Sequence, residues 1–118
     1  MKKTLASAAT AVGLALALVA VGGVASASAV PITVTISGAT CSMSGVAGTY
    51  TTKATNGSCN RVLARIKYIS SGGTTYTVNS ASGFIATATA ATSMVTYRGV
   101  QGSIVIGGVE NWSVFTNL

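Results

Sequence analysis

Residues 60–79 read NRVLARIKYISSGGTTYTVN, and this stretch decides the fold class. Its first half alternates two kinds of side chain, with Val62, Ala64 and Ile66 at even positions and a largely basic set at odd positions. An alternation with period two is typical of a half-buried β-strand. Two glycines interrupt the pattern and strand character then resumes, so we expect a β-hairpin.

The length of the hairpin loop follows from the pairing that it would impose. A two-residue turn would pair Lys67 with Val78 and would mix basic and apolar residues on one face. A three-residue loop over residues 71–73 pairs Lys67 with Thr77 and keeps each face consistent. Because a slip of one residue turns every side chain to the other face, we predict the three-residue loop, with a glycine bulge.

The sequence around this hairpin repeats the pattern of short strands. Ile32 to Ser37 alternates apolar and hydroxyl residues, and Asn56-Gly57 is a strong turn signal. Further strands are expected at 48–54, 84–90, 94–100, 103–107 and 111–116, and residues 41–48 form a short strand or an irregular loop. The sequence therefore predicts an all-β fold, a small disulfide-stapled antiparallel β-sandwich or barrel of about six to eight short strands.

The N-terminal segment has the layout of a secretion signal. Lys2 and Lys3 precede an uncharged stretch, residues 5–24, which ends on the small residues 25–29, so cleavage is expected after Ala27 or Ala29. A membrane anchor is the alternative, but glycines interrupt the stretch and no basic cluster follows it. We predict a cleaved signal helix at residues 1–29, a single mature domain at 30–118, and a secreted, extracellular product without a stable transmembrane anchor.

Export favours a disulfide between the two cysteines. Cys41 and Cys59 would meet an oxidising compartment and would close a loop of about 18 residues, for which chain entropy predicts roughly 3 kcal/mol of stabilisation. An intermolecular bridge or two free thiols are the alternatives. The chain contains no histidine to complete a zinc site, and no metal or cofactor is expected.

The charged residues argue against catalysis. The chain has seven Lys and Arg residues, one carboxylate and no histidine; beyond residue 29, five cations face Glu110 alone, a net charge of +4. General acid–base catalysis needs a positioned titratable group, and glycosidases need two carboxylates. We therefore expect a binding protein and not an enzyme, with Glu110 paired to a cation.

A candidate binding surface lies on the basic face of the hairpin strand. Arg61, Arg65 and Lys67 project from one side of it, which suits an anionic surface or an acidic partner. The alternative is a solvated strand face that discourages edge pairing. Four more residues are candidates to extend the surface: Tyr50, Lys53, Arg98 and Trp112. Trp112 fits either the core or a ligand platform.

One resemblance rests on Cys41, a loop with an aromatic residue, Asn56-Gly57-Ser58-Cys59 and the hairpin that follows. This order resembles the start of the tendamistat-type secreted amylase inhibitors, over less than half of the mature domain. The chain lacks their second disulfide and their Trp-Arg-Tyr triplet. The resemblance implies only a β-sandwich stapled at one end.

Two functions follow from these features. The first is a secreted cationic antimicrobial or bacteriocin-like protein that binds the anionic envelope or lipid surface of competing bacteria. The second is an inhibitor or binding module for an extracellular enzyme or host protein, with Tyr50 and Lys53 presented by the Cys41–Cys59 loop. A passive surface protein is a third reading, and no nucleic-acid partner is expected because export removes most such targets.

Overall fold

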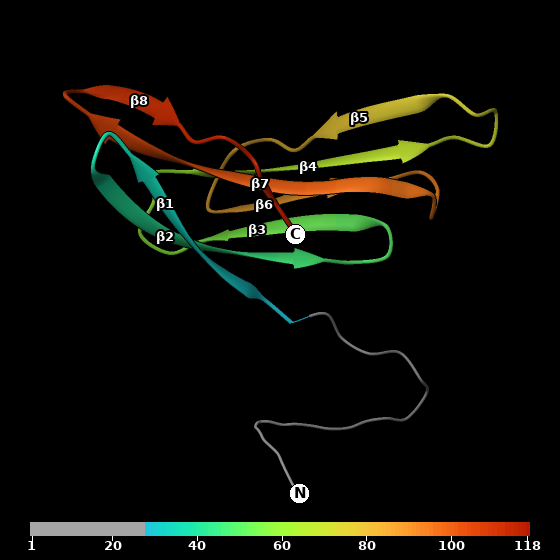
Figure 1. Cartoon of the computed structure of the whole chain (residues 1–118), viewed down its shortest axis with the longest axis horizontal. Helices are drawn as coiled ribbons and strands as arrows, with labels where there is room; N and C mark the ends of the chain where they lie inside the picture. The colour runs from blue at the N-terminus through green and yellow to red at the C-terminus, as the bar shows by residue number, and fades with distance from the viewer. Residues whose placement is uncertain (1–27) are drawn as a thin grey trace, which may run out of the picture.

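The computed structural model describes residues 28–118, which form two antiparallel β-sheets (Figure 1). Across the first sheet the order is β1 (Val30–Ile36), β2 (Ala39–Ala47), β3 (Thr51–Asn56) and β6 (Ile85–Thr89). Across the second it is β5 (Thr75–Asn79), β4 (Val62–Ile69), β7 (Val95–Ile106) and β8 (Val109–Trp112), with β9 (Thr116–Asn117) also paired to β7. The predicted signal, residues 1–29, falls almost entirely outside the described residues.

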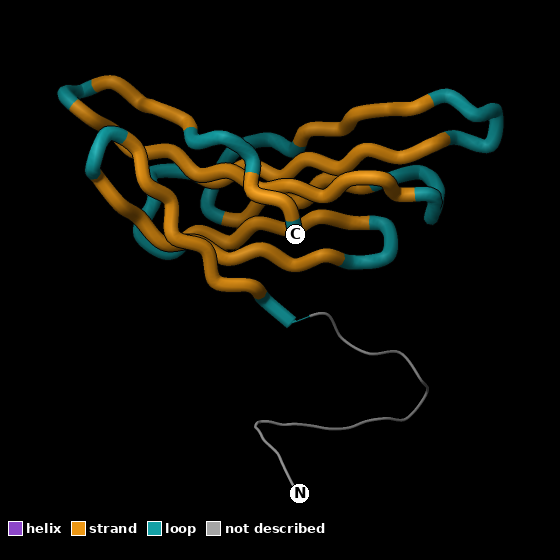
Figure 2. The backbone as a smooth tube through the Cα atoms, in the orientation of Figure 1, coloured by secondary structure: helices purple, strands orange, loops and turns teal. Residues whose placement is uncertain are grey.

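The described residues contain strands and loops only, as Figure 2 shows. Within them there is no helix that could span a membrane. The two sheets keep separate edges, so of the two predicted architectures the sandwich is observed and the closed barrel is not. The predictions of an all-β, antiparallel and disulfide-stapled fold are confirmed.

Small residues fill the space between the sheets. β3 packs against β4 and β7, and β6 packs against β4. Five of the twelve buried apolar residues are alanines, and no aromatic side chain is among them. The core consists of Val34, Cys41, Met43, Ala54, Cys59, Val62, Ala64, Ile66, Ala86, Ala88, Ala90 and Val100. This composition lets the sheets approach closely while burying little volume per residue.

The β4–β5 hairpin has the predicted register. Lys67 pairs with Thr77, and Tyr68 stacks on Tyr76 with ring centroids 5.6 Å apart. The loop spans residues 71–73 and ends on Gly73, whose φ of +87° lies in the left-handed region that glycine adopts at little cost. The consistency of the two faces therefore predicted this loop length correctly.

The disulfide between Cys41 and Cys59 is confirmed, with Cα atoms 4.8 Å apart. It links β2 to the segment that leads from β3 into β4. The residues between the cysteines form the paired strands β2 and β3, so they belong to a sheet and not to an open loop. The irregular loop considered for residues 41–48 is therefore wrong, because β2 is continuous from Ala39 to Ala47.

Two strand boundaries also differ from the prediction. Residues 94–100 and 103–107 were expected as separate strands, but β7 runs unbroken from Val95 to Ile106. The stretch 111–116 was expected as one strand, but β8 ends at Trp112 and β9 begins at Thr116, which brings the total in residues 28–118 to nine strands. β7 is unbroken because the glycines within it permit close approach of other groups and do not end the strand.

Gly102 is the clearest of these glycines. A Cβ placed on it would lie 3.0 Å from Sγ of Cys59 and 3.2 Å from both Sδ of Met43 and Cγ2 of Val34. The backbone of β7 therefore passes directly against the disulfide, where any side chain would be crowded.

Candidate binding surface

The odd-numbered residues of β4 lie on the outer face of the second sheet. Val62, Ala64 and Ile66 are fully buried against the first sheet, so the side chains between them point toward solvent. Aromatic side chains from β7, β8 and the β8–β9 loop lie beside the cations of this face. We define the cation–aromatic face by six residues: Arg61, Arg65, Lys67, Tyr97, Trp112 and Phe115.

All three cations of this face lie over aromatic rings, Arg65 and Lys67 most closely. Cζ of Arg65 is 4.1 Å from the ring centroid of Phe115, and Nζ of Lys67 is 5.3 Å from that of Tyr97. A ring attracts a cation within about 6 Å of its centroid, which contributes roughly 0.5–1 kcal/mol at exposed sites. Lys67 faces Tyr97 because the two residues pair across β4 and β7. Gly99 leaves room for the Tyr97 ring, since a Cβ there would lie 2.7 Å from the ring's Cζ.

Arg61 lies on the same face, but structural contacts occupy its guanidinium. Nε donates a hydrogen bond to Oε2 of Glu110 at 2.8 Å, Nη2 donates to Oε1 of the same carboxylate, and Nη1 donates to Oγ of Ser82 at 2.9 Å. Its Cζ also lies 5.7 Å from the ring centroid of Trp112. All three nitrogens thus join the start of β4 to β8 and to the segment after β5.

Glu110 is the only carboxylate side chain of the sequence, and its contacts keep it ionised. Ser103 Oγ and Asn60 Nδ2 donate to Oε2 at 2.8 and 2.7 Å, in addition to the bonds from Arg61. The hydrogen bond from Arg61, followed by that from Ser103, lowers the pKa of Glu110 to about 2 from its ordinary value of 4.5. The expected pairing of Glu110 with a cation is confirmed. A carboxyl group with this pKa carries no proton near neutral pH and cannot donate one there.

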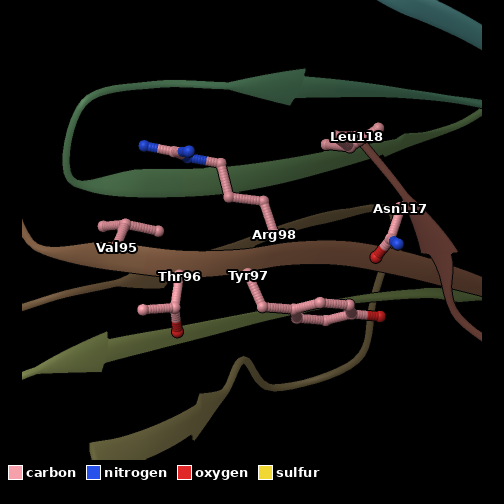
Figure 3. A pocket seen from close by; sticks show the side chains of 6 residues that line it. All are labelled: Val95, Thr96, Tyr97, Arg98, Asn117 and Leu118. Carbon is pink, nitrogen blue, oxygen red and sulfur yellow. The ribbon is translucent and has the colours of Figure 1, made fainter.

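Arg98 and Tyr97 project to opposite sides of β7, as Figure 3 shows. Nε of Arg98 donates to the carbonyl oxygen of Gly48 at 2.9 Å, and Nη2 donates to that of Thr49 at 3.2 Å. Arg98 therefore holds the turn between β2 and β3 and does not extend the cation–aromatic face.

A shallow depression of about 220 Å³ lies beside β7, and Figure 3 shows the side chains around it. It is lined by Val95, Thr96, Tyr97, Arg98, Asn117 and Leu118. None of these six residues has a carboxylate, thiol or imidazole side chain.

The structure places the other candidate residues apart from the cation–aromatic face. Lys53 lies in β3 opposite Thr87 of β6, on the outer face of the first sheet. Tyr50 is 48% exposed in the β2–β3 turn, where its carbonyl oxygen accepts a hydrogen bond from the backbone N–H of Ala90. Four of the seven candidates are brought together: Arg61, Arg65, Lys67 and Trp112.

Sequence reasoning missed two residues of this face, Tyr97 and Phe115, and the contact of Asn79 with Arg65. Tyr97 could have been predicted from the alternation along its strand, β7, because it lies at a position whose side chain points outward. Asn79, whose Oδ1 accepts a hydrogen bond from Nε of Arg65 at 2.7 Å, follows from the hairpin register. Phe115 lies in the loop between β8 and β9, where no periodic pattern predicts the direction of a side chain.

Comparison with family models, with curated proteins and with solved structures gives no match for this chain. The resemblance to the tendamistat-type inhibitors therefore supports nothing beyond a stapled sandwich.

Proposed function

We propose that this chain is a secreted, cationic, bacteriocin-like antimicrobial protein that binds the anionic envelope of competing bacteria and acts without catalysis. The observation that carries the proposal is the neighbouring placement of Arg65 and Lys67 on the outer face of β4, each over an aromatic ring. The single carboxylate side chain is paired with Arg61 and does not offset these charges.

Electrostatics and restricted motion both favour binding at this face. Residues 30–118 carry a net charge of +4, which attracts the protein to an anionic surface over a distance. A cation already held against a ring loses less side-chain freedom on binding than a free one does. The disulfide is compatible with an oxidising, extracellular setting.

The test compares two lysines that differ in location and not in charge. Lys67→Ala removes a cation from the cation–aromatic face, and Lys53→Ala removes one from the opposite sheet. We expect Lys67→Ala to weaken both binding to anionic vesicles and growth inhibition of related bacteria several-fold more than Lys53→Ala does. Equal losses would show that net charge alone acts. Absence of growth inhibition across a broad bacterial panel at micromolar dose would refute the antimicrobial function.

The alternative is an inhibitor or binding module for an extracellular protein, and one observation favours it. Tyr50 is half exposed in a turn whose carbonyls at Gly48 and Thr49 are held by Arg98, so the turn is ordered before any partner binds. For this function Tyr50→Ala would abolish inhibition of an extracellular hydrolase and leave vesicle binding intact. The opposite pattern, lost vesicle binding in Lys67→Ala with no hydrolase inhibited by the wild type, would favour the envelope.

A further inference from the structure

The three arginines of residues 28–118 differ in how many guanidinium nitrogens they have free. Arg61 uses all three nitrogens within the protein, and Arg98 uses Nε and Nη2. Arg65 donates only through Nε, to Asn79. Within the described part of the chain, its Nη1 and Nη2 have no hydrogen-bond partner. Arg65 therefore keeps the pair of parallel donors that suits bidentate binding of an oxyanion.

The contacts of Arg65 also fix the plane of these donors. The Phe115 ring supports the guanidinium at 4.1 Å, and the hydrogen bond from Nε to Oδ1 of Asn79 at 2.7 Å resists rotation of the group. Asn79 is the cross-strand partner of Arg65 in the β4–β5 ladder, so the backbone register sets this contact. A guanidinium held in this way loses little conformational entropy when it grips a ligand.

Lys67 supplies a second positive charge at the next outward position of β4. Two residues along a strand are separated by about 6.6 Å, within the reach of two long side chains that converge on one group. Arg65 offers a planar fork, and Lys67 offers a compact charge that adapts to its partner. A phosphate group can fill both roles, because two of its oxygens match the fork while its charge interacts with the ammonium.

We infer that Arg65 and Lys67 form a phosphate-binding site, in which Nη1 and Nη2 of Arg65 grip two oxygens of one phosphate group and Lys67 neutralises it. This inference rests on the proposed function and makes it specific, since the envelope component recognised is then a phosphodiester bound through the guanidinium of Arg65 and not a surface attracted by net charge alone. Both lipid headgroups and phosphodiester polymers of the cell wall carry this chemistry.

The decisive variant is Arg65→Lys, which keeps the charge and removes the fork. Binding of the purified protein would be measured to phosphatidylglycerol vesicles and to oleate-containing vesicles of equal surface charge, whose anions are carboxylates. We expect Arg65→Lys to weaken binding to the phosphate vesicles about tenfold although the charge is unchanged, the cost of one lost charged hydrogen bond. A carboxylate also fits the guanidinium fork, so the carboxylate vesicles rank the two anions: a wild type that binds them as tightly as the phosphate vesicles would refute phosphate as the ligand. Lys53→Ala is the control for a change of charge elsewhere, and thermal unfolding of each variant checks the fold.

The outcomes separate this inference from the proposed function. If Arg65→Lys binds both vesicles like the wild type while Lys67→Ala still loses binding, the phosphate site is refuted and the proposed function stands. If the wild type binds neither vesicle, inorganic phosphate is titrated while the arginine Nε–H signals are followed by NMR. A saturable shift of the Arg65 signal supports the site without the envelope function, and no shift refutes both. Soluble polyglycerol phosphate would then be added to the protein bound to vesicles. Release of the protein would identify the wall polymer as the source of the phosphate, and no release would identify the lipid.

Discussion

Arg61 and Glu110 lie 49 residues apart in the sequence and form a two-pronged ion pair that joins the start of β4 to β8. Because Ser103 donates to the same carboxylate from β7, the pair ties three strands of the second sheet together. Within the cation–aromatic face, Arg61 therefore has a structural role. Its replacement would disturb the sheet, so it is a poor probe of binding.

Stability should depend on pH through Glu110. Its pKa is about 2 in the folded protein against an ordinary 4.5, so the stabilisation it provides is complete above about pH 5 and is lost as the pH falls from 4.5 through 2. Glu110→Gln should lower the melting temperature at neutral pH and flatten its dependence on pH in this window. The check is thermal unfolding of both proteins between pH 2 and 7. Parallel curves would mean that Glu110 is not the linked group.

Gly102 should not tolerate a side chain. In Gly102→Ala the new Cβ would be crowded by Sγ of Cys59 and by Sδ of Met43, and we expect a loss of about 1–3 kcal/mol in the free energy of unfolding. Gly83→Ala is a matched control, because a Cβ there meets only one backbone oxygen at 3.9 Å. Urea denaturation of the two variants measures the difference. Equal stability would contradict the close approach of β7 to the disulfide.

Removing the disulfide should destabilise the protein without changing its topology. Replacing Cys41 and Cys59 together by alanine releases a closure spanning 18 residues, and chain entropy predicts a loss of about 3 kcal/mol. Urea denaturation of the double variant, compared with the disulfide-bonded wild type, checks this value. A loss below about 1 kcal/mol would indicate that the paired strands β2 and β3 already restrict this segment in the unfolded chain.

Thr52 should be replaceable with a gain in stability. It is fully buried in β3, and its Oγ1 has no hydrogen-bond partner among the described residues. A buried unpaired hydroxyl is costly, so the isosteric Thr52→Val should raise the free energy of unfolding by about 1 kcal/mol. Thr87→Val on the exposed side of β6 should change it by less than about 0.5 kcal/mol. Destabilisation in Thr52→Val would reveal a partner for the hydroxyl, such as a bound water.

The β4–β5 hairpin shows why part of the fold could be predicted from the sequence. Alternation along β4 assigned its buried and exposed faces, and agreement between the faces of β4 and β5 assigned the register and the loop. The same reasoning failed in β7, where Gly99 and Gly102 look like interruptions. There Gly99 makes room for the ring of Tyr97 in its own strand, and Gly102 makes room for the disulfide, whose cysteines lie far away in the sequence.

The class of fold, the Cys41–Cys59 pair and the side of β4 on which its cations lie could all be predicted from the sequence. These follow from period-two alternation and from having only two cysteines, which are local or compositional properties. The tertiary structure alone decided which cations are free: Glu110 occupies Arg61, the carbonyls of Gly48 and Thr49 occupy Arg98, and Phe115 and Asn79 orient Arg65. The physical reason is that hydrogen bonds and ring contacts depend on which strands become neighbours and in what register, and alternation within one strand does not specify either.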